Sequence, residues 1–90
     1  MKCSIVIPTY NEDLNIYNLV DEILKEYKVK VIIVDDGSRT PVVINNKDVE
    51  VLRNKINKGK GEAIVRGIKY SSESGFDYSI VLDGDLQHHP

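Results

Sequence analysis

The sequence predicts an α/β domain built on an open parallel sheet of about four strands with flanking helices. Short runs rich in β-branched residues alternate along the chain with amphipathic segments of helical periodicity. Turn sequences containing aspartate, asparagine or glycine follow the apolar runs. This alternation implies right-handed crossovers and favours the strand order 3-2-1-4, with the winding reversed between strands 1 and 4.

The first strand is expected at Cys3 to Pro8, a β-branched run stopped by proline. Asn11 is placed to cap a helix that follows, near Asp13 to Tyr27. Apolar residues recur there at spacings of three and four, at Ile16, Val20, Ile23, Leu24 and Tyr27. Charged residues occupy the other face, so this helix is expected to cover one side of the sheet.

The second strand is expected at Val29 to Val34, which ends in the turn sequence Asp35-Asp36-Gly37-Ser38. An irregular connection is expected between Arg39 and Asp48, because Pro41 and two asparagines interrupt a short apolar trio. The third strand is expected at Val49 to Arg53.

A polar loop containing glycines leads to a second helix, which is expected to begin near Gly61 or Glu62. Its buried stripe is expected to contain Ala63, Ile64, Gly67 and Ile68, with Gly67 permitting close contact between helix and sheet. The fourth strand is expected at Tyr78 to Leu82, directly before Asp83-Gly84-Asp85.

The composition fits one small domain, assigned to residues 1–90. The formal net charge of −2 gives no general attraction for nucleic acid. The single cysteine, Cys3, excludes an intramolecular disulfide and fits a reducing, cytoplasmic compartment. No apolar stretch approaches the ~20 residues that span a bilayer, so association with the cytoplasmic face of a membrane is expected only through a longer parent chain.

Three polar segments are expected to meet at one mouth, because they follow strands 1, 2 and 4. These segments are Pro8 to Glu12, Asp35 to Ser38, and Asp83 to Asp85. Ligands of open α/β sheets bind at the carboxyl ends of the strands. Two carboxylates one residue apart are suited to holding a divalent cation against phosphate.

Four motifs, IVIPTYNE, VIIVDDGS, NKGKGEA and VLDGDLQHHP, resemble in order those of the inverting family 2 glycosyltransferases. These enzymes have the A-type nucleotide-sugar fold, which is Rossmann-like. The similarity is greatest to the polyprenyl-phosphate sugar transferases, including dolichyl-phosphate mannose synthase. The resemblance covers nearly the whole chain and implies that it is the nucleotide-sugar-binding half of such a domain, truncated before the acceptor side.

The resemblance implies a metal site at the end of the chain. Asp83 and Asp85 match the Asp-x-Asp motif that binds Mg²⁺ or Mn²⁺ on the nucleotide diphosphate, and Gln87 matches a further position in the metal shell. Hard cations prefer carboxylate and phosphate oxygens, in keeping with this assignment. The alternative for these residues is a polar turn after a strand.

The resemblance also implies a nucleotide site. Its matched residues are Pro8, Tyr10, Glu12, Asp35, Asp36, Lys60 and Asp83. Asp36 or Asp35 matches the acid that accepts a hydrogen bond from the base, and Lys60 is placed to reach nucleotide or phosphate near a helix start. The alternatives are an ordinary Asp-Gly turn for Asp36, a helix cap for Glu12 and a solvated loop lysine for Lys60.

The activity that the resemblance implies is transfer of a sugar from a GDP- or UDP-sugar to a polyprenyl phosphate or a glycan, with inversion. No residue is matched to a catalytic base. A non-catalytic nucleotide-binding or interaction module of the same fold stays open. A dinucleotide oxidoreductase is disfavoured, because Pro8-Thr9-Tyr10-Asn11-Glu12 replaces the glycine-rich fingerprint after the first strand.

The fourth strand is expected to lie at the edge of the sheet with its backbone groups unpaired. Such an edge favours pairing with another strand. We therefore expect two copies to associate as a homodimer, either by pairing through this edge or by exchange of the segment after the fourth strand.

Overall fold

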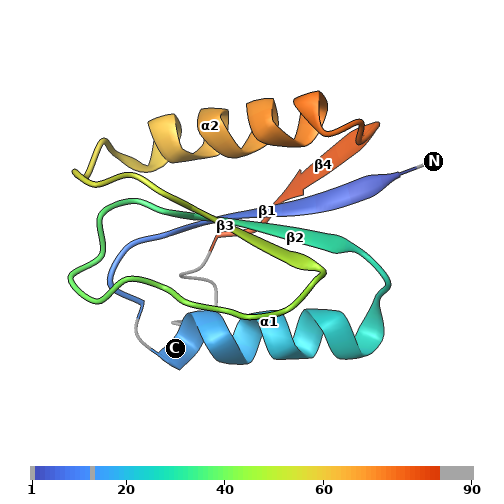
Figure 1. Ribbon diagram of the computed structural model, residues 1–90, viewed down its shortest axis with the longest axis horizontal. Helices are drawn as coiled ribbons and strands as arrows, with labels where there is room; N and C mark the ends of the chain where they lie inside the picture. Colours follow the sequence, from blue (N-terminus) through green and yellow to red (C-terminus); the bar gives the residue numbers. More distant parts are fainter. Residues whose placement is uncertain (1, 13, 84–90) are drawn as a thin grey trace.

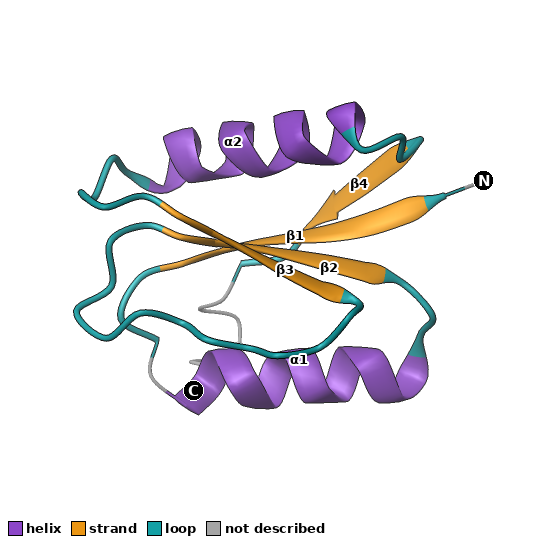
Figure 2. Ribbon diagram, in the orientation of Figure 1, coloured by secondary structure: helices purple, strands orange, loops and turns teal. Residues whose placement is uncertain are grey.

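The computed structural model describes residues 2–12 and 14–83, which form a parallel sheet between two helices (Figure 1). The elements are β1 (Cys3–Thr9), α1 (Leu14–Glu26), β2 (Lys30–Asp35), β3 (Val49–Arg53), α2 (Lys60–Glu73) and β4 (Tyr78–Val81). Helix α2 covers one face of the sheet and α1 the other (Figure 2). The predicted α/β class is confirmed.

The strands of this sheet run parallel in the order β3-β2-β1-β4, as predicted. In the centre, Ile5 of β1 pairs with Val31 of β2 on one side and Ile80 of β4 on the other. The carboxyl ends of β1, β2 and β3 lie together at the left of Figure 1. The polar segments that follow the strands therefore share one edge of the sheet.

The core on the α1 side is formed by branched apolar residues. Its buried members are Ile5, Ile7, Ile16, Val20, Ile23, Val31, Ile33 and Val49. Each such side chain contributes about 1.5–3 kcal/mol when fully buried. The prediction that Tyr27 belongs to the buried stripe is wrong: α1 ends at Glu26, and Tyr27 is 62% exposed.

The α2 side of the sheet is packed through small residues. Ala63, Gly67 and Ser71 are the buried positions of α2, and they recur every four residues. A Cβ atom on Gly67 would overlap Val6 Cγ1 and lie 3.1 Å from Val34 Cγ2, which confirms the predicted close contact. The assignment of Ile68 to the buried stripe is wrong, because the small residues set the contact face and Ile68 lies beside it, 43% exposed.

The connection from Arg39 to Asp48 contains neither helix nor strand, as predicted. Strand β4 lies at one end of the described sheet, where Tyr78 and Ile80 are exposed. Pairing of two copies through this edge stays a prediction. In the described ranges, neither helix combines the length and apolar character that crossing a bilayer requires.

Candidate functional site

A cavity of about 380 Å³ lies where β1, β2 and β4 end and α2 begins. It is lined by Pro8, Thr9, Tyr10, Glu12, Asp36, Asn57, Gly59, Lys60, Ala63 and Asp83. This set contains every residue predicted to bind nucleotide except Asp35. The structure therefore brings together side chains that are separated by up to 75 positions in sequence, from Pro8 to Asp83.

Larger hollows occur elsewhere on the described surface. One of about 790 Å³ lies at the amino ends of the strands, where Lys2, Lys30 and Asp48 are among the lining residues. Another, of about 510 Å³, lies beside Arg39 and shares Glu12 with the smaller cavity. Parallel α/β sheets bind ligands at their carboxyl ends, which excludes the 790 Å³ hollow. The 510 Å³ hollow also follows β1 and β2, but Glu12 is the one predicted nucleotide-binding residue in its lining, so the 380 Å³ cavity is the candidate site.

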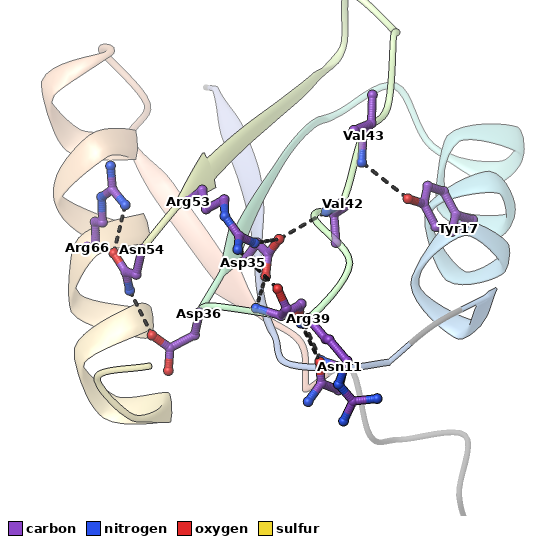
Figure 3. Close-up of polar contacts among 11 residues, drawn as sticks. Asn11, Tyr17, Asp35, Asp36, Arg39, Val42, Val43, Arg53, Asn54 and Arg66 are labelled. Atoms are coloured by element: carbon purple, nitrogen blue, oxygen red, sulfur yellow. Dashed lines mark hydrogen bonds and ion pairs between the residues drawn. The ribbon is translucent and has the colours of Figure 1, made fainter. Parts of the chain in front are cut away.

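Asp36 is buried at the wall of this cavity and accepts three hydrogen bonds from described residues. Its Oδ1 accepts from Asn54 Nδ2 at 2.9 Å (Figure 3) and from the Lys58 backbone N–H at 2.9 Å, and its Oδ2 accepts from the Gly59 N–H at 2.8 Å. Burial raises the pKa of Asp36, but the three donors outweigh it and hold the pKa below its ordinary value. Since a carboxylate has about four lone-pair positions, one remains for a ligand.

Asp35 has a different environment, although it is the neighbour of Asp36. It is fully buried, and its Oδ2 accepts from Val42 N at 2.9 Å and from Arg53 Nη1 at 2.8 Å. Its Oδ1 accepts from Ser38 N at 2.9 Å. Burial raises the pKa of Asp35, but donors from Ser38, Val42 and Arg53 lower it below its ordinary value. Asp35 thus fixes the turn after β2, outside the cavity lining.

Gly37 brings this turn against the loop that follows β3. Its φ is +82°, a conformation that glycine adopts without steric cost. A Cβ atom at this position would lie 2.8 Å from the backbone nitrogen of Asn57. Any larger residue would push the Asn57 backbone away from this turn, and Asn57 lines the cavity, so glycine is required for the cavity wall.

Lys60 and Asp83 form an ion pair through Nζ and Oδ2 at the cavity. Lys60 is the first residue of α2, and Asp83 lies just beyond β4. Both side chains are partly exposed, so water screens the pair. The pair places a cation and a carboxylate side by side at the end of the sheet where phosphate was predicted to bind.

The segment after β1 is joined to the turn after β2 by Asn11. Asn11 has a φ of +53°, its N–H donates to Ser38 Oγ at 2.9 Å, and its Oδ1 accepts from Arg39 N at 2.8 Å (Figure 3). The side chain expected to cap α1 therefore connects two loops. This connection fixes the segment that carries Tyr10 and Glu12.

Thr9 lines the cavity, although no role was predicted for it. It is buried, and its Oγ1 has no hydrogen-bond partner among the residues that the structure describes. Buried polar groups are almost always paired, so an unpaired hydroxyl beside a cavity is consistent with a bound polar ligand or water. Asn57, Gly59 and Ala63 were likewise unassigned, although they lie within or beside the quoted motifs.

Of the residues predicted to hold a metal, Asp83 lines the cavity, whereas Asp85 and Gln87 lie outside the described residues. Within residues 2–12 and 14–83, no group of three acidic, histidine or cysteine side chains is arranged as a metal site. The Asp83 carboxylate is a ligand of the type that Mg²⁺ and Mn²⁺ prefer. The metal therefore stays a proposal.

The sequence matches the model of Glycosyl transferase family 2 over residues 4–90. The chain belongs to this family. It is 35% identical over 99 residues to the dolichol-phosphate mannosyltransferase of Pyrococcus furiosus, an alignment that covers 100% of this chain and 27% of the relative. The predicted family and its A-type, Rossmann-like fold are thus confirmed.

Two further relatives of this glycosyltransferase chain carry related names. The UDP-N-acetylglucosamine–dolichyl-phosphate N-acetylglucosaminyltransferase of Methanococcus voltae is 32% identical over 105 residues, covering 96% of this chain and 42% of the relative. The dolichyl-phosphate beta-glucosyltransferase of Dictyostelium discoideum is 28% identical over 101 residues, covering 91% of this chain and 30% of the relative. The chain spans 27 to 42% of the length of these three relatives.

Proposed function

We propose that this chain is the donor-binding part of a glycosyltransferase that moves a sugar from a UDP- or GDP-sugar to a polyprenyl phosphate with inversion. The cavity that joins Asp36, Lys60 and Asp83 is the observation that carries the proposal. The names of the three relatives support a polyprenyl-phosphate acceptor over a glycan. Such an acceptor is a lipid, so we place the full-length protein at the cytoplasmic face of a membrane.

The nucleoside is proposed to bind near the ends of β1 and β2. Asp36 is ionised at neutral pH and keeps one accepting position for an N–H of the base. Tyr10 lies beside it, exposed at the cavity wall, with Pro8 in the same lining. An aromatic ring and a proline suit the flat apolar faces of a base.

The diphosphate is proposed to bind between Lys60 and Asp83. Lys60 contributes its ammonium charge, and the amino end of α2 contributes backbone N–H groups that favour an anion. Asp83, with Asp85 and Gln87, would hold Mg²⁺ or Mn²⁺, which supplies neutralisation of the charge on the departing diphosphate.

Inversion follows when the acceptor attacks from the face opposite the leaving group. The bond from the anomeric carbon to the acceptor oxygen forms as the bond to the diphosphate oxygen breaks, and the electron pair leaves on the diphosphate. A polyprenyl phosphate is already ionised and needs orientation without deprotonation, whereas a glycan hydroxyl needs a general base. The role of Lys60 in this step is to hold the leaving group by its charge.

A second candidate is a nucleotide-binding module that does not transfer sugar. It is favoured by the cavity itself, because the roles proposed for Asp36, Lys60 and Asp83 are all binding roles and a fold alone does not fix activity. Both candidates require nucleotide binding, and only the first requires turnover. Transfer assays with labelled nucleotide sugars and polyprenyl phosphate, on the longest form of the protein, separate them.

The direct test is calorimetric titration of UDP and GDP into the protein, with and without Mn²⁺. We expect one of the two nucleotides to bind with an affinity that rises with the metal. The matched variants Asp36→Asn and Asp83→Asn should weaken binding, whereas Asp48→Asn, at the opposite edge of the sheet, should not. Absence of binding for both nucleotides with the metal present would rule out the proposal.

A further inference from the structure

Arg66 lies on α2 and does not line the 380 Å³ cavity, yet hydrogen bonds connect it to Asp36. Arg66 Nη1 donates to Asn54 Oδ1 at 2.7 Å, and Asn54 Nδ2 donates to Asp36 Oδ1 at 2.9 Å. Figure 3 shows the three side chains in a row, from α2 through the end of β3 to the end of β2. A cation outside the cavity is thus linked to the acid at its wall by a single amide.

Together with a third hydrogen bond, these contacts form a closed ring that runs from Arg66 through Asn54, Asp36 and Gly59 and returns to Arg66 along α2. The Gly59 N–H, one residue before α2, donates to Asp36 Oδ2 at 2.8 Å, and Arg66 lies within the same helix. Helix α2 is therefore held at two positions by the pair of Asp36 and Asn54. Lys60 lies between these positions, so the ring fixes the part of the chain that carries its ammonium into the cavity.

The chemistry of the row fixes the orientation of the Asn54 amide. A guanidinium only donates hydrogen bonds, and an ionised carboxylate only accepts them. Asn54 is buried, its Oδ1 faces Arg66, and its NH₂ faces Asp36. Hydrogen bonds in such a chain polarise one another, so the charge of Arg66 strengthens the donation to Asp36.

Asn54 is also anchored through its backbone, since its N–H donates to the Asp35 carbonyl at 2.9 Å. The side chain therefore has little freedom to find another partner. Loss of Arg66 would leave the buried Asn54 Oδ1 without this donor and would weaken the hold on Asp36.

We propose that Arg66 is a positioning residue of the donor site: through Asn54 it orients the Asp36 carboxylate and the Lys58–Lys60 backbone that this carboxylate holds. The inference rests on the proposed function, because it assigns the ordered Asp36 and Lys60 to nucleotide binding. Arg66 itself does not touch the nucleotide. Its effect on binding is transmitted through two hydrogen bonds.

The test compares Arg66→Met with Arg66→Lys and with the control Lys69→Met. Lys69 is exposed on the same helix, and its replacement removes the same charge while leaving both hydrogen bonds of the Asn54 side chain in place. The first readout is the affinity for whichever of UDP and GDP the unmodified protein binds. The second is the pair of backbone amide resonances of Lys58 and Gly59, which donate to Asp36.

We expect Arg66→Met to weaken nucleotide binding roughly three- to tenfold, as for the loss of one hydrogen bond, and to move both amide resonances. Arg66→Lys should weaken nucleotide binding less and move the two amide resonances less than Arg66→Met does. Lys69→Met should change neither the affinity nor the resonances. Unchanged affinity together with unchanged Lys58 and Gly59 resonances in Arg66→Met would overturn the inference. If the unmodified protein binds neither nucleotide, the proposed function fails, and the two resonances alone decide whether Arg66 positions Asp36.

Discussion

Lys60 and Asp83 neutralise one another across the candidate site, one at the start of α2 and the other after β4. Each is assigned a different partner when ligand binds: phosphate for Lys60 and a divalent cation for Asp83. Formation of the proposed complex would therefore exchange one ion pair for two new ones.

Replacement of Lys60 by methionine is expected to affect metal and nucleotide in opposite directions. Without the ammonium, Asp83 should bind Mn²⁺ more tightly in the absence of nucleotide, by up to about fivefold, as for an exposed ion pair. Nucleotide affinity should fall. Titration of Mn²⁺ followed by electron paramagnetic resonance measures the first effect, with Lys55→Met as a control, since Lys55 is exposed and does not line the cavity. Weaker Mn²⁺ binding in Lys60→Met would contradict this interpretation.

Acid is expected to destabilise the fold through Asp35 and Asp36. The pKa of each is lowered in the folded state, so each stabilises the fold above the unfolded pKa of about 3.9, and this contribution is lost as the pH falls. The free energy of unfolding should therefore decrease from about pH 5 to about pH 2. Urea denaturation across this range checks the slope, which should be smaller in Asp36→Asn. An identical slope in the variant would exclude Asp36 as a contributor.

Gly67→Ala should destabilise the protein, although alanine favours a helix by up to about 1 kcal/mol. The new methyl group would overlap the buried Val6 side chain, and overpacking of this kind costs about 1–3 kcal/mol. Gly61→Ala is the matched control on α2, because no atom lies within 4 Å of the added Cβ. Chemical denaturation should give opposite signs for the two variants. A stabilised Gly67→Ala protein would show that α2 is packed less closely than described.

Thr9→Val should raise the free energy of unfolding. The substitution removes a buried hydroxyl that has no partner among the described residues and keeps the shape of the side chain. The expected gain is up to about 1 kcal/mol, because an unpaired buried polar group carries its full desolvation cost. Thr9→Ser keeps the hydroxyl and should show no gain. Destabilisation by Thr9→Val would mean that the hydroxyl is paired in solution, by water or otherwise.

The position of β4 at one end of the described sheet predicts weak self-association. Tyr78 and Ile80 of this strand are 53% and 51% exposed. A charge on an edge strand opposes pairing, so Ile80→Lys should remove any dimer seen by sedimentation at high concentration. A protein that sediments as a monomer at every concentration would contradict the predicted homodimer.

Much of the fold was predictable because its signals are local. Strands rich in valine and isoleucine and the alternation with helices indicate parallel crossovers, and the strand order follows from their handedness. Gly67 and its close contact were predicted, but the rest of the buried face of α2 was harder, since the apolar Ile68 is a stronger pattern signal than the small Ser71 that makes the contact. Close packing of a helix on a sheet depends on small residues, whereas hydrophobic periodicity detects large apolar ones.

Most residues that line the cavity were predictable from motifs at strand ends, but the separate roles of these residues were not. Asp35 and Asp36 are adjacent, and successive side chains at the end of a strand point to opposite faces of the sheet. Which aspartate faces the cavity depends on Arg53 and Asn54, which supply the donors from β3 and the loop after it. The link from Arg66 to Asp36 likewise depends on tertiary contacts that no local motif contains.

The most direct measurement is a titration of the nucleotide diphosphate and a diamagnetic cation, Mg²⁺, into isotope-labelled protein, followed through backbone amide resonances. The account predicts that the largest shifts belong to Tyr10, Asp36, Gly59, Lys60 and Asp83, which surround the 380 Å³ cavity. Largest shifts at Lys2, Lys30 and Asp48, at the amino ends of the strands, would contradict it. So would a spectrum that does not change at all.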